Sequence, residues 1–207
     1  MNRVILSAST DETILAVTRQ HKLVDLEIEQ QINTEIVGCI YKGIVKNIVP
    51  AVDGIFVDIG IGKNAFLRRK DLLNEKRFPT EGSPILAQVI KSDTDMKGAL
   101  ITEKISMLGK YAVTLSGTGY IGVSKKIRSE SVRERLKETG KEICAEHMGL
   151  IIRTAAENAD MDEFRKDIIR LKENWDIIQK RFRMEKSPTL LYLSLIHISE
   201  PTRRTPI

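Results

Sequence analysis

The sequence lacks any long hydrophobic run, because charged residues interrupt every apolar stretch after a few positions. A helix that crosses a membrane needs about 20 consecutive apolar residues, so no membrane-spanning helix is predicted. The N-terminus holds only the short run Val4 to Ala8 before Asp11 and Glu12. That run is too short for the apolar part of a signal peptide. We therefore expect a cytoplasmic protein with no membrane partner.

Cysteine is also scarce, with only Cys39 and Cys144 in the chain. They lie far apart, and neither belongs to a C-x-x-C pair or stands near regularly spaced histidines. This excludes a disulfide framework and gives no sign of a zinc site. We expect both cysteines to act as small buried hydrophobic residues.

What the sequence does have is an uneven positive charge. Its 207 residues are 42% hydrophobic and 29% charged, which is typical of one large or two small globular domains. The net charge is +5, and seven Lys or Arg face three Glu between Lys125 and Lys141. A second basic cluster comprises Lys63, Arg68, Arg69 and Lys70. A partner that carries phosphate is one interpretation; a solvated basic face without a ligand is the other.

Short strand-like segments dominate the first half of the chain. Residues 3–30 predict strands around a turn at Arg19 to Lys22. Five further β-like runs follow, at residues 36–49, 54–61, 63–72, 84–92 and 98–104. No helical segment between them is long enough for a βαβ crossover. This spacing favours a small barrel of the oligonucleotide-binding kind.

The second half of the chain predicts two helices and a strand. Ser129 can cap a short helix that ends at Thr139 and Gly140, and residues 148–154 resemble a strand. Asp160 begins a longer helix, with Glu163 completing a capping box. Its apolar stripe comprises Phe164, Ile168, Leu171, Trp175, Ile178 and Phe182. We interpret this stripe as core packing against a sheet, with binding of a partner helix as the alternative.

One motif, Gly60 to Ala65, spells G-x-G-x-x-A, a variant of the dinucleotide fingerprint. No adequate helix follows it, and Asn64 stands where a phosphate loop needs Ser or Thr, so both phosphate-loop interpretations fail. A tight turn between two strands fits better and can place Phe56 and Phe66 on one face. Two such rings could stack on bases of single-stranded nucleic acid. Burial of one or both rings in the barrel core is the alternative.

These residues resemble a known family. The segment IYKGIVKNIVPAVDGIFVDIGIGKNAFL is similar to the S1 domain of bacterial ribonuclease E/G endoribonucleases, with FVDIG nearer the ribonuclease G form. The similarity continues through KGALITEKISMLGKYAVTL, GVSKKI and MGLIIRTAAENAD. It implies an α+β fold in which a five-stranded S1/OB barrel is inserted into an RNase H-like α/β domain with a 5′-sensor region.

The resemblance also implies domain limits. Residues 1–34 would be the first strands of the RNase H-like subdomain and should pair with segments beyond residue 107. Residues 35–106 would be the S1 barrel, and residues 107–192 the 5′ sensor with the rest of the RNase H-like part. Residues 193–207 fit no element and resemble a translated sequencing adaptor, so we expect a non-native tail on a truncated N-terminal piece.

Site residues follow from the same resemblance. Phe56, Phe66 and Lys97 match the S1 positions that grip single-stranded RNA. Positions that bind a 5′-terminal monophosphate or support its nucleotide match Gly109, Val113, Lys125, Lys126, Arg153 and Thr154. Ribonuclease E has two arginines where this chain has Lys125 and Lys126. Because lysine lacks the guanidinium fork, we expect weaker geometric discrimination between 5′ ends.

The family cleaves RNA with paired aspartates that hold Mg²⁺, and cysteines that bind structural Zn²⁺ join its subunits. The resemblance places both sets beyond residue 192, and Asp53, Asp58, Asp93 and Asp95 do not have the setting of a metal site. We expect this chain to bind RNA ends without metal or cleavage, and the intact enzyme to be a homo-oligomer acting in RNA processing and decay. A non-catalytic S1-domain RNA-binding protein is the alternative.

Overall fold

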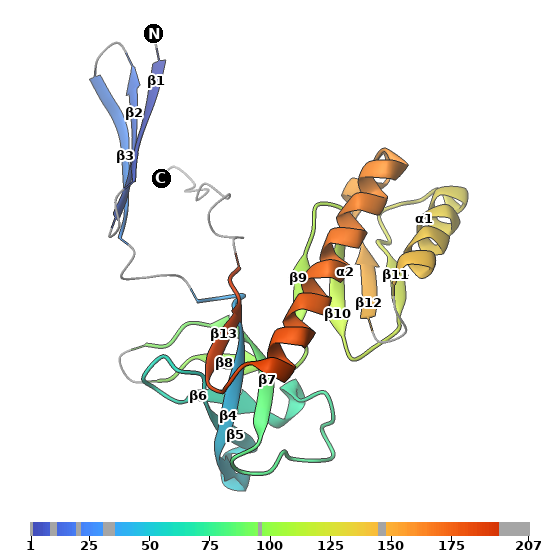
Figure 1. Cartoon of the computed structure of the whole chain (residues 1–207). Helices are drawn as coiled ribbons and strands as arrows, with labels where there is room; N and C mark the ends of the chain where they lie inside the picture. Colours follow the sequence, from blue (N-terminus) through green and yellow to red (C-terminus); the bar gives the residue numbers. More distant parts are fainter. Residues whose placement is uncertain are drawn as a thin grey trace. The chain divides into compact units, whose positions relative to one another are not determined.

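The computed structural model describes residues 2–8, 12–19, 22–30, 36–94, 97–144 and 148–194. It divides into two compact units, Met1–Glu35 and Ile36–Ile207 (Figure 1). Neither helix of the described segments combines the length and the apolar character needed to cross a membrane. The expected tail falls outside the described residues from position 195 onward.

The first unit contains an antiparallel sheet of three strands, β1 (Asn2–Ala8), β2 (Glu12–Arg19) and β3 (Lys22–Gln30). Arg19 pairs with Lys22, so the chain reverses where the sequence predicted a turn. The further pairing expected with segments beyond residue 107 stays a prediction.

The second unit begins with a closed five-stranded barrel. Its strands are β4 (Ile40–Val49), β5 (Gly54–Asp58), β6 (Ala65–Arg68), β7 (Pro84–Lys91) and β8 (Leu100–Thr102). They are ordered β4-β5-β6-β8-β7, and β4 pairs with β7 to close the barrel. Each of the five predicted β-like runs holds one of these strands. Cys39 is buried in the barrel core as expected.

Strand β4 also pairs with β13 (Thr189–Tyr192), a strand that the sequence did not predict. Ile44 pairs with both Asp58 and Pro84, so β5 and β7 occupy opposite edges of β4. Ile40 pairs with Gln88 of β7 and with Tyr192. Strand β13 therefore continues the edge that β5 occupies further along β4.

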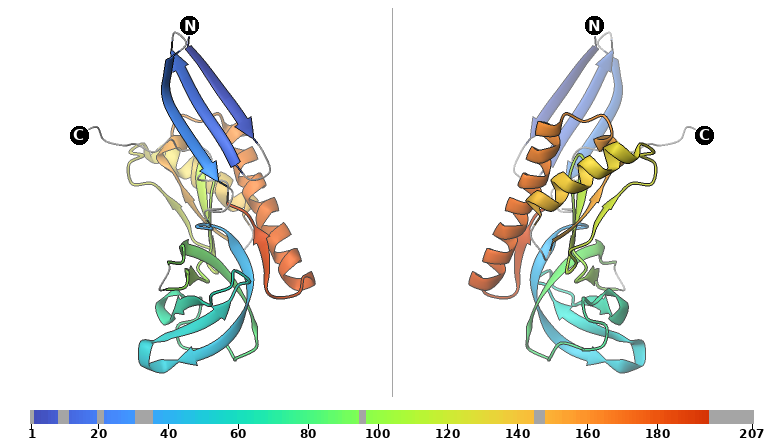
Figure 2. Two further views of the ribbon diagram at one scale, coloured as in Figure 1. Left: turned by 90° about the vertical axis from the view of Figure 1, so that its left-hand side faces the viewer. Right: turned by 90° about the vertical axis from the view of Figure 1, so that its right-hand side faces the viewer.

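A second sheet follows the barrel, with strands β9 (Ser106–Leu108), β10 (Ala112–Ser116), β11 (Ile121–Val123) and β12 (Met148–Ile152). Its order is β11-β12-β10-β9, and only the β11–β12 pairing is parallel. Helices α1 (Glu130–Ile143) and α2 (Met161–Met184) pack against it (Figures 1 and 2). Buried residues of the sheet and both helices form a second core.

Helix α1 corrects one prediction. It continues through Thr139 and Gly140 to Ile143 instead of ending at the glycine. Gly140 is buried, and a Cβ atom there would lie 3.2 Å from the Leu150 side chain. The glycine therefore permits close packing of α1 on β12. Cys144, at the end of α1, is half-buried, and burial raises the pKa of its thiol.

Helix α2 confirms the predicted cap and apolar stripe. The Asp160 carboxylate accepts hydrogen bonds from the backbone N–H groups of Asp162 at 2.8 Å and Glu163 at 3.2 Å. Four stripe residues are buried in the second core, and Trp175 and Phe182 pack against it partly buried. The four buried residues are Phe164, Ile168, Leu171 and Ile178. Core packing is therefore the role of most of this stripe.

The two helix caps give a stability test. Asp160 makes two side-chain hydrogen bonds to backbone N–H groups, whereas the side chain of Ser129 caps no backbone group of α1. We predict that Asp160→Ala lowers the free energy of unfolding by about 1 kcal/mol. Ser129→Ala, the control, should change it by less than about 0.5 kcal/mol. Denaturant unfolding measures both, and equal losses would contradict the assignment.

Candidate nucleic-acid interface

Two phenylalanines form a cross-strand pair on the barrel. Phe56 of β5 lies opposite Phe66 of β6, with ring centroids 5.4 Å apart and planes inclined at 49°. Their strand neighbours Ile55, Val57 and Leu67 are fully buried in the barrel core, whereas both phenylalanines are only partly buried. Since successive side chains of a strand point to opposite faces, the two rings lie outside the core.

The turn that joins these strands depends on its glycines. Gly60 and Gly62 have φ values of 85° and 92°, a left-handed region that favours glycine. The Asp58 carboxylate accepts a hydrogen bond from the Gly60 N–H at 3.0 Å and pairs with Lys46 at 3.3 Å. The glycine motif is therefore a turn, as predicted.

A groove of about 720 Å³ lies beside the two rings. Lys97, predicted from sequence, lines this groove together with Phe56 and Phe66. The other lining residues are Val52, Lys91, Ser92, Thr94, Gly98 and Leu100. Lys91 was not predicted, although it ends the β7 run and so faces the same loop. Two lysines and two partly exposed rings therefore border one depression.

A second group of predicted residues meets at one end of the four-stranded sheet. Strands β11 and β12 are parallel, with Val123 opposite Ile152, so the segments after both strands leave at the same end. There Ser124 Oγ lies 3.1 Å from Thr154 Oγ1 and accepts a hydrogen bond from the Lys126 N–H at 3.4 Å. Lys125 and Lys126 are both exposed. The parallel pairing thus brings the lysine pair beside Arg153 and Thr154.

Arg153 connects this end to the loop before β10. Its Nη1 donates to the main-chain oxygens of Gly109 at 2.8 Å and Lys110 at 3.2 Å. Its backbone N–H donates to Tyr111 O at 2.8 Å. Gly109 therefore lies next to Arg153. Val113 lies further along β10, opposite Ile151 and on the sheet face away from the buried Ala112.

Residues that the sequence analysis missed hold this loop from the side of α2. Asp167, which is 7% exposed, accepts a hydrogen bond from the Tyr111 N–H at 2.8 Å. Glu163 accepts from Tyr111 Oη at 2.6 Å and from Lys110 Nζ at 3.0 Å. The sequence did contain a signal for Asp167, because this acidic residue directly precedes Ile168 on the apolar face of the predicted helix.

These contacts shift two pKa values. The hydrogen bond from Tyr111 is the main cause that lowers the pKa of Glu163, and Lys110 lowers it further. The pKa of Lys110 is raised by its contacts with Tyr111 and Glu163. The loop is therefore held by a charged pair as well as by Arg153 and Asp167.

No group of three or more His, Cys, Asp or Glu residues within the described segments is arranged to hold a metal ion. Asp53 forms an ion pair with Arg69, and Asp95 lies outside the described residues. The described side chains therefore offer no clustered ligand set for Mg²⁺ or Zn²⁺. At the end of the four-stranded sheet, the groups that could hold a phosphate are the guanidinium of Arg153, the ammonium groups of the lysine pair, the hydroxyl of Thr154 and backbone N–H groups.

Comparison with known families assigns both parts of the second unit. Residues 34–102 match the S1 RNA binding domain, and residues 106–204 match the Ribonuclease E/G family. The chain belongs to the ribonuclease E/G family. Its barrel, which carries the two phenylalanines, is therefore an S1/OB barrel within an α+β fold.

Members of the ribonuclease E/G family with similar sequences include three bacterial proteins. Ribonuclease G of Escherichia coli (strain K12) is 34% identical over 206 residues, covering 91% of this chain and 42% of the relative. Ribonuclease G of Haemophilus influenzae is 34% identical over 203 residues, covering 90% and 41%. Ribonuclease E of Synechocystis sp. is 34% identical over 165 residues, covering 75% and 24%. The chain thus spans less than half the length of these relatives.

The contacts of Glu163 predict a pH effect. Because the pKa of Glu163 is lowered in the folded chain, its ionised form contributes stability above its unfolded pKa, and this contribution is lost as pH falls through its folded pKa. Tyr111→Phe removes the hydrogen bond that is the main cause of the lowered pKa. This substitution should therefore raise the pKa of Glu163 toward its ordinary value. Carboxyl ¹³C NMR titration measures the shift. The control, Tyr120→Phe, removes the hydroxyl of an exposed tyrosine and should leave the pKa of Glu163 unchanged. Equal changes of this pKa in the two variants would contradict the role given to Tyr111.

Proposed function

We propose that this chain is the RNA-binding and 5′-end-sensing part of a Mg²⁺-dependent, single-strand-specific endoribonuclease that acts in RNA processing and decay. The observation that supports this most is the pair of phenylalanines beside two lysines on an S1 barrel. The second support is the basic end of the four-stranded sheet, where Arg153, Thr154 and two lysines meet.

The first part of the proposal concerns the RNA strand. Phe56 and Phe66 stack on successive bases, because every base has a π face and each stack is worth roughly 1–3 kcal/mol. Lys97 and Lys91 supply positive charge at the edge of the same groove, where the phosphates between stacked bases would lie. Binding through ring stacking and positive charge, without hydrogen bonds to base edges, tolerates many RNA sequences.

The second part concerns the 5′ end. Only Nη1 of the Arg153 guanidinium is hydrogen-bonded to the described part of the chain, so Nη2 and Nε can donate to phosphate oxygens. The Thr154 hydroxyl can add one hydrogen bond, and the exposed ammonium groups of Lys125 and Lys126 add charge. Since lysine binds phosphate as a point charge, Arg153 is the group that supplies directional recognition.

The third part concerns cleavage. The family resemblance implies aspartates that would hold Mg²⁺ and cysteines that would hold structural Zn²⁺, and the described residues here do not fit either set. We propose that both belong to a region of the full-length homo-oligomeric enzyme that this chain does not include. This chain would then bind and orient single-stranded RNA, while another region breaks the phosphodiester bond.

The stacking pair predicts a loss of RNA affinity. Phe56→Leu or Phe66→Leu keeps apolar bulk but removes one ring face, so each should weaken binding of single-stranded RNA about 5- to 150-fold. Fluorescence anisotropy with a labelled oligonucleotide measures the change. Val52→Ala, which trims a non-aromatic residue of the same groove, is the control and should lose much less. Similar losses in all three variants would argue against stacking.

The proposed 5′-phosphate site predicts a preference between RNAs that differ at the 5′ end. The intact chain should bind 5′-monophosphorylated RNA more tightly than 5′-hydroxyl RNA of the same sequence, and Arg153→Ala should abolish that ratio. Arg165→Ala removes the same charge from an exposed site on α2, where Arg165 pairs with Glu142, and should keep the ratio. Equal affinity of the intact chain for both RNAs would reject 5′-end sensing. It would favour a non-catalytic S1 RNA-binding protein.

A further inference from the structure

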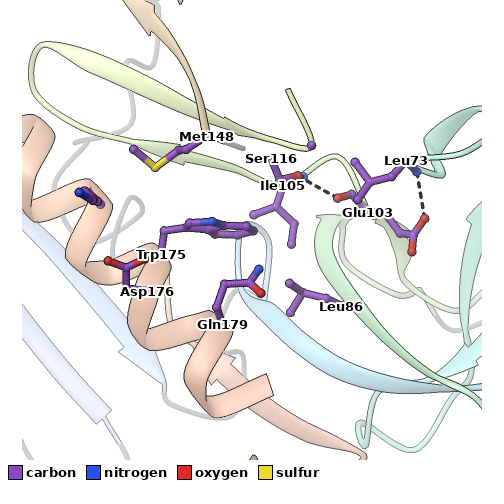
Figure 3. A pocket seen from close by; sticks show the side chains of 11 residues that line it. Leu73, Leu86, Glu103, Ile105, Ser116, Met148, Trp175, Asp176 and Gln179 are labelled. Atoms are coloured by element: carbon purple, nitrogen blue, oxygen red, sulfur yellow. Dashed lines mark hydrogen bonds between the residues drawn. The ribbon is translucent and has the colours of Figure 1, made fainter. Parts of the chain in front are cut away.

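The four-stranded sheet has one face that the helices cover and one that they leave open. On the covered face, Ile152 is fully buried in the second core, and Met148, further back on β12, lines a pocket of about 410 Å³ between α2 and the barrel. Figure 3 shows the Trp175 indole projecting from α2 into this pocket. Successive side chains of a strand alternate between faces. Ile151 therefore lies on the open face, where it is exposed.

An apolar row crosses the open face. Val113 of β10 pairs with Leu108 of β9 on one side and with Ile151 of β12 on the other. Ile151 pairs in turn with Gly122 of β11. We call these four residues the open apolar row. Leu108 and Ile151 are 44% and 39% exposed although both are apolar, and neighbouring strands lie about 5 Å apart, so the row is one continuous surface.

An exposed aromatic ring lies at the β11 end of the row. Tyr120 is 65% exposed and directly precedes β11 (Ile121–Val123). A Cβ atom at Gly122 would lie 2.8 Å from Cε1 of Tyr120 and 3.1 Å from its Oη, so the ring lies over the glycine. Any side chain larger than that of glycine would displace the ring. The glycine thus brings Tyr120 into the row while most of the tyrosine stays open to solvent.

Positive groups border the same row. Arg153 follows Ile151 by two positions in extended backbone, and its N–H continues the β10–β12 pairing by donating to Tyr111 O at 2.8 Å. Since side chains two positions apart share a face, Arg153 leaves the chain on the open face. The exposed Lys125 and Lys126 follow β11 at the same end of the sheet. The apolar row therefore lies next to the proposed 5′-phosphate site.

The chemistry of this face matches a nucleotide better than other partners. A nucleotide carries a phosphate at one end and a base with a flat, stacking face at the other, in the same order as the cations and the apolar row. An acidic peptide would pair with the cations but leave the row uncovered, and an apolar segment would leave the cations unused. Sheet faces with exposed aromatic rings are suited to stacking unpaired bases.

We propose that Tyr120 stacks on the base of the second nucleotide of an RNA whose 5′ phosphate is bound at Arg153. This inference rests on the proposed 5′-end sensing, in which Val113 supports the first nucleotide. From Val113 the row runs to Leu108 in one direction and to Tyr120 in the other, and only the second direction ends at an aromatic ring. Two strand spacings, roughly 10 Å, separate Val113 from Gly122, which leaves room for two successive bases.

A missing base tests this contact in the intact chain. Two 5′-monophosphorylated RNAs are compared by fluorescence anisotropy, one complete and one with an abasic second nucleotide. The complete RNA should bind about 5-fold or more tightly, because one stacked base is lost from the other. Tyr120→Leu should abolish this ratio, and Tyr120→Phe, which keeps the ring, should preserve it. Ile177→Ala, at an exposed apolar site on α2, is the control and should also preserve it.

The preference for a 5′ monophosphate separates failure of this inference from failure of 5′-end sensing. Tyr120→Leu should keep the preference for monophosphorylated over 5′-hydroxyl RNA, which also shows that the variant is folded. If the intact chain has that preference but binds complete and abasic RNA equally, 5′-end sensing stands and the role of Tyr120 is wrong. If the intact chain lacks the preference, both are wrong. A Tyr120→Leu effect that depends on the first base instead of the second would also overturn the inference.

Discussion

Strand β4 pairs with three other strands, and these pairings close the barrel that carries the proposed stacking pair and return the chain to the barrel after α2. Its pairing with β7 closes the barrel, which fixes β5 and β6 and so sets Phe56 opposite Phe66. Its pairing with β13 brings the chain back to the barrel after α2. Lys42 of β4 strengthens this connection, because its Nζ donates to the main-chain oxygens of Phe182 and Glu185, each at 2.7 Å. The pocket that holds Trp175 lies along the same join.

In the proposed function, Arg153 both holds a loop and binds a phosphate. One nitrogen of its guanidinium already holds the loop at Gly109 and Lys110, and the others remain for a phosphate. Asp167 and Glu163 hold the same loop from α2. A group fixed in this way loses little side-chain freedom when a ligand binds, so more of the interaction energy is available for recognition.

Local sequence signals predicted the barrel strands, the strands of the first unit, β12 and both helices, but they did not predict β9, β10 and β11 of the second sheet. Alternating runs and turn residues identified the five barrel strands, and the capping box with its apolar stripe identified α2. The prediction for α1 was wrong at its end, because a glycine can terminate a helix or permit close packing, and only the neighbouring Leu150 distinguishes these roles. Strand β13 was missed because its pairing with β4 joins residues more than a hundred positions apart.

The candidate sites could also be predicted only in part from the sequence. Phe56 and Phe66 could be paired from sequence, because a short turn fixes the register of the two strands that carry them. The resemblance supplied Arg153 and Thr154, and their proximity to Lys125 and Lys126 depends on the parallel β11–β12 pairing. Asp167 and the open apolar row beside Tyr120 required the packing and pairing of segments that are far apart in the sequence, which no local pattern contains.

The central claim is that one chain binds the RNA strand on the barrel and its 5′ phosphate at the end of the second sheet. NMR chemical-shift mapping tests it directly, with two otherwise identical single-stranded RNAs that differ only in the 5′ phosphate. The account predicts that signals of Phe56, Phe66 and Lys97 shift with both RNAs, while signals of Arg153 and Thr154 shift only with the phosphorylated one. Phosphate-dependent shifts that appear elsewhere, with none at Arg153, would contradict it.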